Sequence, residues 1–277
     1  MAKVSEEARK KYFERIGPYK KGVAEIQEKE SRVEKIIQSG DPGAPYKRLA
    51  VANDCLTQVS YYLVMNSLSV TLLGVKNEAY LNDARKTCYK ILIHLEKVFS
   101  DLVDAPYGDY EANLEAVASY PENERYQLVR KVGFAIARVV DGFGENSKWR
   151  WSFVDLHGRL ATIAKNCMNL KQLSAGMDPR SEGFKERIEH FNLTRRLLQD
   201  AADQYRKKYE LSTSRMDDFR QAIAFLGALK RLSLLLARPQ EADALKRKID
   251  VWKAKMEADQ QNSETKSRLN RLEGGGK

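Results

Sequence analysis

Apolar residues recur along most of the chain at alternating steps of three and four, which is the spacing of one face of an α-helix. The pattern is clearest in residues 46–73, where Leu49, Leu56 and Leu63 mark one stripe and a second apolar row broadens it. No segment alternates apolar and polar residues at the period of a β-strand. The pattern therefore predicts an all-α fold, an elongated multi-helix bundle of about nine helices with a coiled-coil-like N-terminal arm.

The N-terminal arm, residues 1–39, carries a narrow apolar seam in an otherwise polar segment, with the spacing that is typical of coiled coils. Gly17-Pro18 interrupts this seam, which predicts either two helices or one helix with a sharp kink. Because the seam is too narrow for a core helix, we expect it to bind a partner, either from this chain or from a second copy. The residues predicted for this role are Tyr12, Ile16, Tyr19, Val23, Ile26, Val33 and Ile37.

Residues 46–237 are predicted to form a self-contained central helical bundle, because their apolar faces are broad. The clearest linker, from Gly40 to Pro45, precedes this bundle and is rich in glycine and proline. Further helices are expected between the later turns of the chain, over residues 77–103, 110–119, 122–140, 148–175, 182–211 and 216–237.

Residues 239–277 are predicted to form a basic amphipathic helix, opened by Pro239, and a polar tail that frays from about Asp259 onwards. Helices of this kind can lie at an anionic membrane surface, although packing of the apolar stripe on the protein's own body is favoured. The stripe is a second candidate for partner binding and consists of Leu245, Ile249, Trp252 and Met256.

The formal net charge is +10, and the surplus of lysine and arginine lies at both ends of the chain. A neutral middle with basic ends predicts a packed body whose outer segments meet nucleic acid, anionic lipid or an acidic protein. Most basic clusters alternate with acids at helical spacing, which is typical of a solvated helix face, and no nucleic-acid-binding motif is recognisable. Nucleic-acid or other polyanion binding is therefore an alternative to protein binding.

The three cysteines, Cys55, Cys88 and Cys167, are widely spaced among apolar residues. This pattern predicts small core residues in a reducing compartment rather than disulfides or a zinc site. The most apolar stretch, residues 222–237, contains Lys230 and Arg231 and is too short to span a bilayer. We therefore expect a cytoplasmic protein without a transmembrane segment.

No pattern specifies a reaction, a metal or a cofactor. The Glu-x-x-His spacing of di-iron bundles is absent, and His94, His157 and His190 each stand alone. An enzyme is less favoured than a binding protein, although a site assembled from distant residues stays open. One anion site is a candidate at the start of the helix after Gly144, where Ser147 is predicted to cap the helix and Lys148 and Arg150 add positive charge.

Three polar residues, Glu30, Asn66 and Arg195, interrupt the apolar seams of three predicted helices. Polar seam positions fix register and partner choice, so some of these seams are candidate interfaces. Together the patterns predict a non-enzymatic helical scaffold or interaction subunit of a larger assembly, with self-association as one form of that role.

Overall fold

The computed structural model describes residues 5–144, 147–176 and 178–274, with side chains up to residue 265 except residue 263. These residues form ten α-helices and no strand, so the predicted all-α fold is confirmed. The helices are α1 (Glu6–Gln38), α2 (Ala44–Leu73), α3 (Glu78–Phe99), α4 (Glu111–Glu115), α5 (Glu122–Phe143), α6 (Arg150–Asn166), α7 (Leu170–Ala175), α8 (Phe184–Lys208), α9 (Met216–Leu235) and α10 (Pro239–Gly274).

Local chemistry explains several of the helix ends. Ser5 and Asn77 cap α1 and α3, and their side chains accept hydrogen bonds from the backbone N–H groups of Ala8 (3.1 Å) and Tyr80 (3.2 Å). Gly74 ends α2 in the left-handed conformation with φ +68°, which a glycine adopts without steric cost. Gly74 and Asn77 therefore define the two ends of the short turn between α2 and α3.

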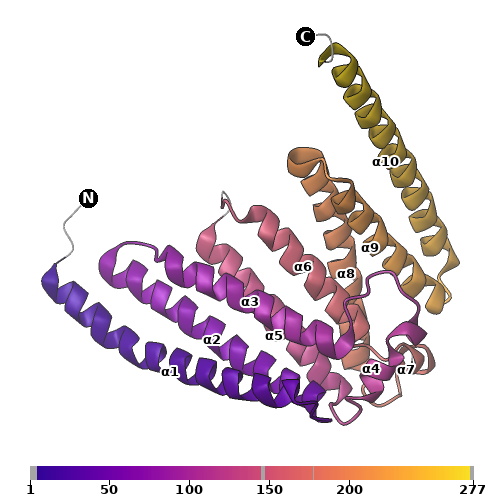
Figure 1. Ribbon diagram of the computed structural model, residues 1–277. Coiled ribbons are helices and arrows are strands. Elements are labelled where there is room, and N and C mark those ends of the chain that lie inside the picture. The colour runs from indigo at the N-terminus through magenta and orange to yellow at the C-terminus, as the bar shows by residue number, and fades with distance from the viewer. Residues whose placement is uncertain (1–4, 145–146, 177, 275–277) are drawn as a thin grey trace. The chain divides into compact units, whose positions relative to one another are not determined.

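The chain divides into two compact units, and the first contains residues up to 102 together with residues 106–191. Within it, α1 packs on α2 and α2 packs on α3, as Figure 1 shows, while α5 contacts α2, α3 and α6. The side chains of Ile91, Leu95 and Ile136 are fully buried at its centre.

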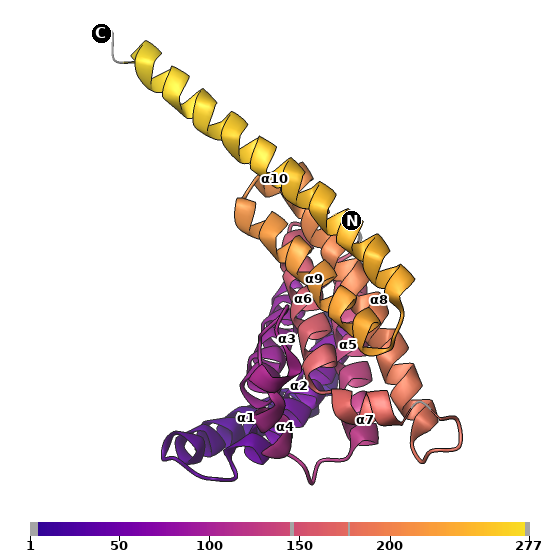
Figure 2. The same ribbon diagram turned by 90° about the vertical axis from the view of Figure 1, so that its right-hand side faces the viewer.

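The second unit contains residues 103–105 and 192–277. Here α8 continues into a short π-helical segment, Tyr209–Thr213, and α10 packs along α9. Aromatic rings form much of its core, with Phe219 stacked on Tyr209 at 4.7 Å and Trp252 at 6.1 Å from Phe219 between ring centroids. Figures 1 and 2 both show the C-terminal part of α10 continuing past the end of α9.

Three predicted boundaries differ from the structure. Pro18 lies inside a single continuous α1, where Gly17 and Pro18 are exposed, so that water can bind the carbonyl that the missing N–H leaves free. The helix predicted over residues 148–175 is two helices, α6 and α7. They are separated because Asn169 caps α7 by accepting a hydrogen bond from the N–H of Gln172 (3.0 Å).

The third difference is that α10 does not end near Asp259 but continues as a helix to Gly274. The last residues of the predicted tail, 275–277, lie outside the described part of the chain, as do residues 1–4 of the predicted arm. None of the described helices has a stretch that is both long and apolar enough to cross a membrane.

Candidate interaction surface

The apolar seam of α1 packs against the protein's own α2. Tyr12, Ile16, Val23 and Ile37 are buried, while Tyr19, Ile26 and Val33 are half-buried. The ring of Tyr19 lies 5.6 Å from the ring of Tyr61 on α2. The buried members of the seam therefore belong to the core of the first unit, and binding of a partner at this seam stays a prediction.

The three polar seam residues have partners within their own unit. The carboxylate of Glu30 pairs with Lys90 of α3 at 2.6 Å, and Asn66 accepts a hydrogen bond from the N–H of Asn77 at 2.9 Å. In the second unit, Arg195 pairs with Glu241 at 2.8 Å. These contacts explain why polar residues interrupt the seams without requiring a second protein.

The apolar stripe of α10 packs in the same way within the second unit. Ile249 and Trp252 are buried, and Leu245 and Met256 are half-buried. Two cations cover the indole of Trp252, with Arg206 at 4.9 Å and Lys248 at 4.8 Å from its centroid. The stripe is thus the contact of α10 with its own unit, and the exposed basic residues lie on the rest of the helix, at Lys246, Arg247, Lys253 and Lys255.

The predicted anion site is arranged differently from the expectation. The helix begins at Arg150 with Trp149 as its N-cap, and no side chain caps it, so the prediction that Ser147 caps this helix is wrong. Ser147 instead accepts a hydrogen bond from the N–H of Trp149 at 3.1 Å. Lys148 lies 3.9 Å from Glu78, and the guanidinium of Arg150 lies over the ring of Trp151.

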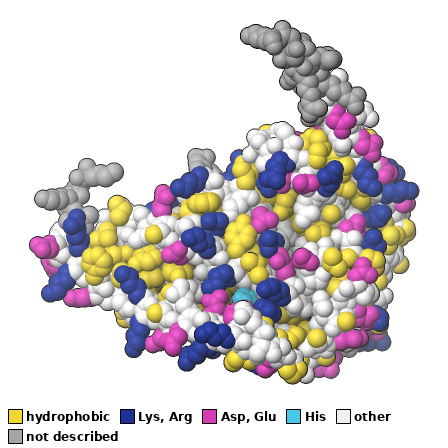
Figure 3. All heavy atoms as spheres, in the orientation of Figure 1, with side chains coloured by type: hydrophobic (Ala, Val, Ile, Leu, Met, Phe, Trp, Pro, Cys, Tyr) yellow, Lys and Arg dark blue, Asp and Glu magenta, His cyan; other side chains and the backbone are white. Residues whose placement is uncertain are grey.

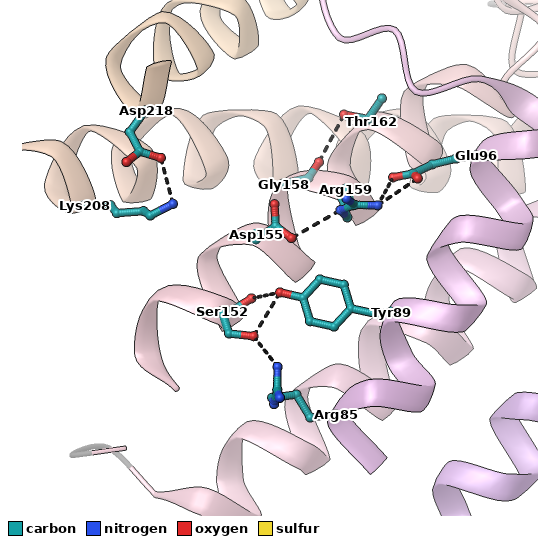
Figure 4. A network of polar contacts seen from close by, with 10 residues as sticks. All are labelled: Arg85, Tyr89, Glu96, Ser152, Asp155, Gly158, Arg159, Thr162, Lys208 and Asp218. Carbon is teal, nitrogen blue, oxygen red and sulfur yellow. Dashed lines mark hydrogen bonds and ion pairs between the residues drawn. The ribbon is translucent and has the colours of Figure 1, made fainter. Parts of the chain in front are cut away.

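A polar network joins α3 to α6, as Figure 4 shows. Arg85 donates to Ser152 Oγ at 2.9 Å and stacks over Trp149 at 3.8 Å, and the hydroxyl of Tyr89 donates to the carbonyl of Ser152 at 2.9 Å. Two turns further along the pair of helices, Arg159 binds Glu96 at 2.9 Å. The network fixes the register of the two helices.

A buried cysteine and histidine lie side by side in the first unit, with Cys167 Sγ and His190 Nε2 3.6 Å apart. Burial lowers the pKa of His190 to about 4 and raises the pKa of Cys167 to about 12. Both groups are therefore neutral at pH 7, and a neutral thiol is a poor nucleophile. The pair packs beneath the stacked ring of Tyr126 as part of the core.

Among the described residues, no group of three or more histidine, cysteine or acidic side chains is arranged to hold a metal ion. A wide polar hollow of about 710 Å³ lies between the start of α5, α7 and the start of α8. Arg187, a cation that lines this hollow, has its partners within the first unit, because it binds Glu122 at 3.1 Å and donates to the carbonyl of Gly176 at 3.1 Å.

An apolar groove lies between α2 and α5 of the first unit and holds about 220 Å³. Phe134 stands at its edge with 68% of its surface exposed, and Lys131 and Arg138 lie one turn before and one turn after it on α5. We call this surface the α2–α5 groove, and its lining residues are Leu56, Val59, Ser60, Leu63, Lys131, Phe134, Ala135 and Arg138.

The wall that α2 contributes to this groove has an unusual composition, because no charged residue occurs from Cys55 to Val75. Outward-facing positions of a solvated helix normally carry charge, yet here they are residues such as Thr57 and Ser67, both exposed. Figure 3 shows charged side chains of both signs spread over the drawn face, with apolar side chains gathered over the part built by α1, α2 and α3.

The sequence predictions did not include the α2–α5 groove. Phe134 lies off the apolar stripe formed by Val129, Val132, Ile136 and Val140, so its helical position marks it as exposed. The uncharged run in α2 is a second signal. Neither pattern could show that the two helices are neighbours.

The model of the TP0443 family matches residues 8–260, and the chain therefore belongs to this family. No curated protein and no solved structure matches the chain.

Proposed function

We propose that this member of the TP0443 family is a non-enzymatic helical interaction subunit that binds partner proteins within a larger assembly. The observation that carries the proposal is the α2–α5 groove, which combines an exposed phenylalanine, an apolar floor and an uncharged wall. Single exposed apolar residues are common on protein surfaces, whereas an apolar groove with polar edges is typical of an interaction site.

Burial of Phe134 by a partner would contribute a substantial free energy of binding. About two thirds of its surface is exposed, which is on the order of 130 Å² for a phenylalanine side chain. Covering that area by a partner contributes roughly 3 kcal/mol at about 25 cal/mol per Å².

Photo-crosslinking in living cells tests the proposal. A photoreactive phenylalanine analogue replaces Ser60 in the groove in one variant and Glu25, which is exposed on α1, in a control variant. We expect defined adducts of higher mass from position 60, lost when Phe134→Ser is added, and none from position 25. The absence of adducts at position 60, or equal adducts at both positions, would overturn the proposal.

A second candidate function is binding of a nucleic acid or another polyanion through α10. Lys246, Arg247 and Lys253 support it, because they are exposed and make no ion pair with a described residue. We expect a single-stranded oligonucleotide to bind at low salt, with an affinity that falls steeply as salt rises. Failure to bind at low salt, or binding that survives reversal of these three charges, would contradict this candidate.

A further inference from the structure

We infer that the α2–α5 groove binds the apolar face of an amphipathic helix from a partner protein, and that acidic side chains lie on both sides of that face. The inference rests on the proposed function and names the chemistry of the partner at the same site.

The shape of the groove favours a helix as the occupant. Along α2 its lining residues run from Leu56 to Leu63, and along α5 they run from Lys131 to Arg138, so that the first and last residue of each wall are seven positions apart. A span of seven residues is two turns, or about 10 Å of helix. Two parallel walls of this length fit a third helix that inserts apolar residues at positions i, i+3 or i+4, and i+7.

The charges at the groove favour a partner helix that has acidic side chains on both sides of its apolar face. The only charged residues in its lining are Lys131 and Arg138, and the wall formed by α2 has no charge. The side chain of Lys131 makes no hydrogen bond or ion pair with any described residue, while Arg138 pairs with Asp141 at 3.1 Å on an exposed part of α5. A carboxylate of the partner next to Lys131 forms an ion pair, whereas a lysine of the partner there is repelled by the like charge. The rim of the groove therefore favours an acidic partner over a basic one.

A second copy of this chain fits the groove less well. A two-fold axis that passes Phe134 perpendicular to α5 would place this helix antiparallel to its copy, and Arg138 would then face Arg130 of the other copy. Arg130 is exposed on the same helix, so this arrangement would bring like charges together at the rim. Charge complementarity therefore points to a different protein.

Binding of designed peptides to the full chain tests the inference. One fluorescent peptide of about 18 residues has leucines on one face and glutamates on its flanks, and the other has lysines in place of the glutamates. We expect the acidic peptide to bind, and Phe134→Ser to weaken binding roughly tenfold or more. Phe13→Ser is the matched control, because Phe13 is an exposed phenylalanine on α1 outside the groove, and it should leave binding unchanged.

Charge reversal gives a second and independent readout. The double variant Lys131→Glu, Arg138→Glu should lose affinity for the acidic peptide and gain affinity for the basic one. No binding of the acidic peptide, equal binding of both peptides, or equal loss in the Phe13 and Phe134 variants would overturn the inference. A homodimer in sedimentation experiments that Phe134→Ser dissociates would also overturn it, in favour of a second copy.

The two proposals can fail separately. If position 60 forms crosslinks in cells but neither peptide binds, the groove is an interaction site whose partner has a different chemistry. If position 60 forms no crosslinks, the proposed function itself is wrong. Circular dichroism of each variant confirms that it is folded before binding is measured.

Discussion

Phe134 should be nearly dispensable for folding, although it is a large apolar residue in the middle of a core helix. Only about a third of its surface is buried, on the order of 60 Å², which is worth about 1.5 kcal/mol. Replacement by alanine recovers about 0.5 kcal/mol of helix propensity. We therefore expect Phe134→Ala to lower the free energy of unfolding by about 1 kcal/mol. Ile136→Ala, two residues away at a fully buried position, should cost about 2–5 kcal/mol.

Urea unfolding followed by tryptophan fluorescence measures both variants. The experiment uses a Trp252→Phe background, because Trp149 and Trp151 then report on the first unit alone. Both variants should keep the same denaturant dependence, so that the midpoint alone reports the change in stability.

The comparison separates a structural from a functional role for Phe134. If Phe134→Ala destabilises the first unit as much as Ile136→Ala does, the side chain is part of the core in solution. The proposal that Phe134 is exposed in order to bind a partner would then be wrong. A small effect on stability together with lost peptide binding is the result that the α2–α5 groove requires.

Three further outcomes follow from buried or crowded groups. Burial lowers the pKa of His190 from 6.5 to about 4, so the unfolded chain binds a proton that the folded chain does not. The free energy of unfolding has its full value above pH 6.5 and falls by up to about 3 kcal/mol as the pH drops towards 4. Urea unfolding midpoints measured across this range should show the decrease, and His190→Gln should make it smaller. Cys167, with its pKa raised to about 12, should not react with a thiol reagent until urea unfolds the chain. Gly22→Val should cost about 2 kcal/mol in thermal or urea unfolding, because its Cβ would lie 2.6 Å from the ring of Tyr61, and Tyr61→Ala should reduce that cost.

Much of the fold could be predicted from the sequence, because helical periodicity is a local property. Periodicity does not predict the break between α6 and α7, because the apolar stripe before the break continues to Leu170. The signal for the break is Asn169, a residue type that commonly caps helices. At Gly17-Pro18 the sequence allows two helices or one kinked helix, and the structure excludes the first alternative, because α1 continues through the exposed Pro18.

The candidate site could not be predicted in the same way. Phe134 and the uncharged run of α2 are each visible in the sequence, but Leu63 and Lys131 lie far apart along the chain. Only tertiary packing makes them neighbours, and no local pattern in a single sequence encodes which helix packs beside which. The buried residues of the two predicted partner seams contact other helices of their own unit, and binding of a partner at those seams stays a prediction.

The two walls of the α2–α5 groove come from helices that are not neighbours in the sequence, so the groove forms only after the later helix has been made. The helices α1, α2 and α3 are neighbours in sequence and pack on one another, and we expect such local contacts to form early in folding. The second wall of the α2–α5 groove does not exist until residues 122–143 have been made and have docked. If the α2–α5 groove is the interaction site that we propose, a chain that ends before α5 should therefore fail to bind the partner, because the groove then lacks its second wall.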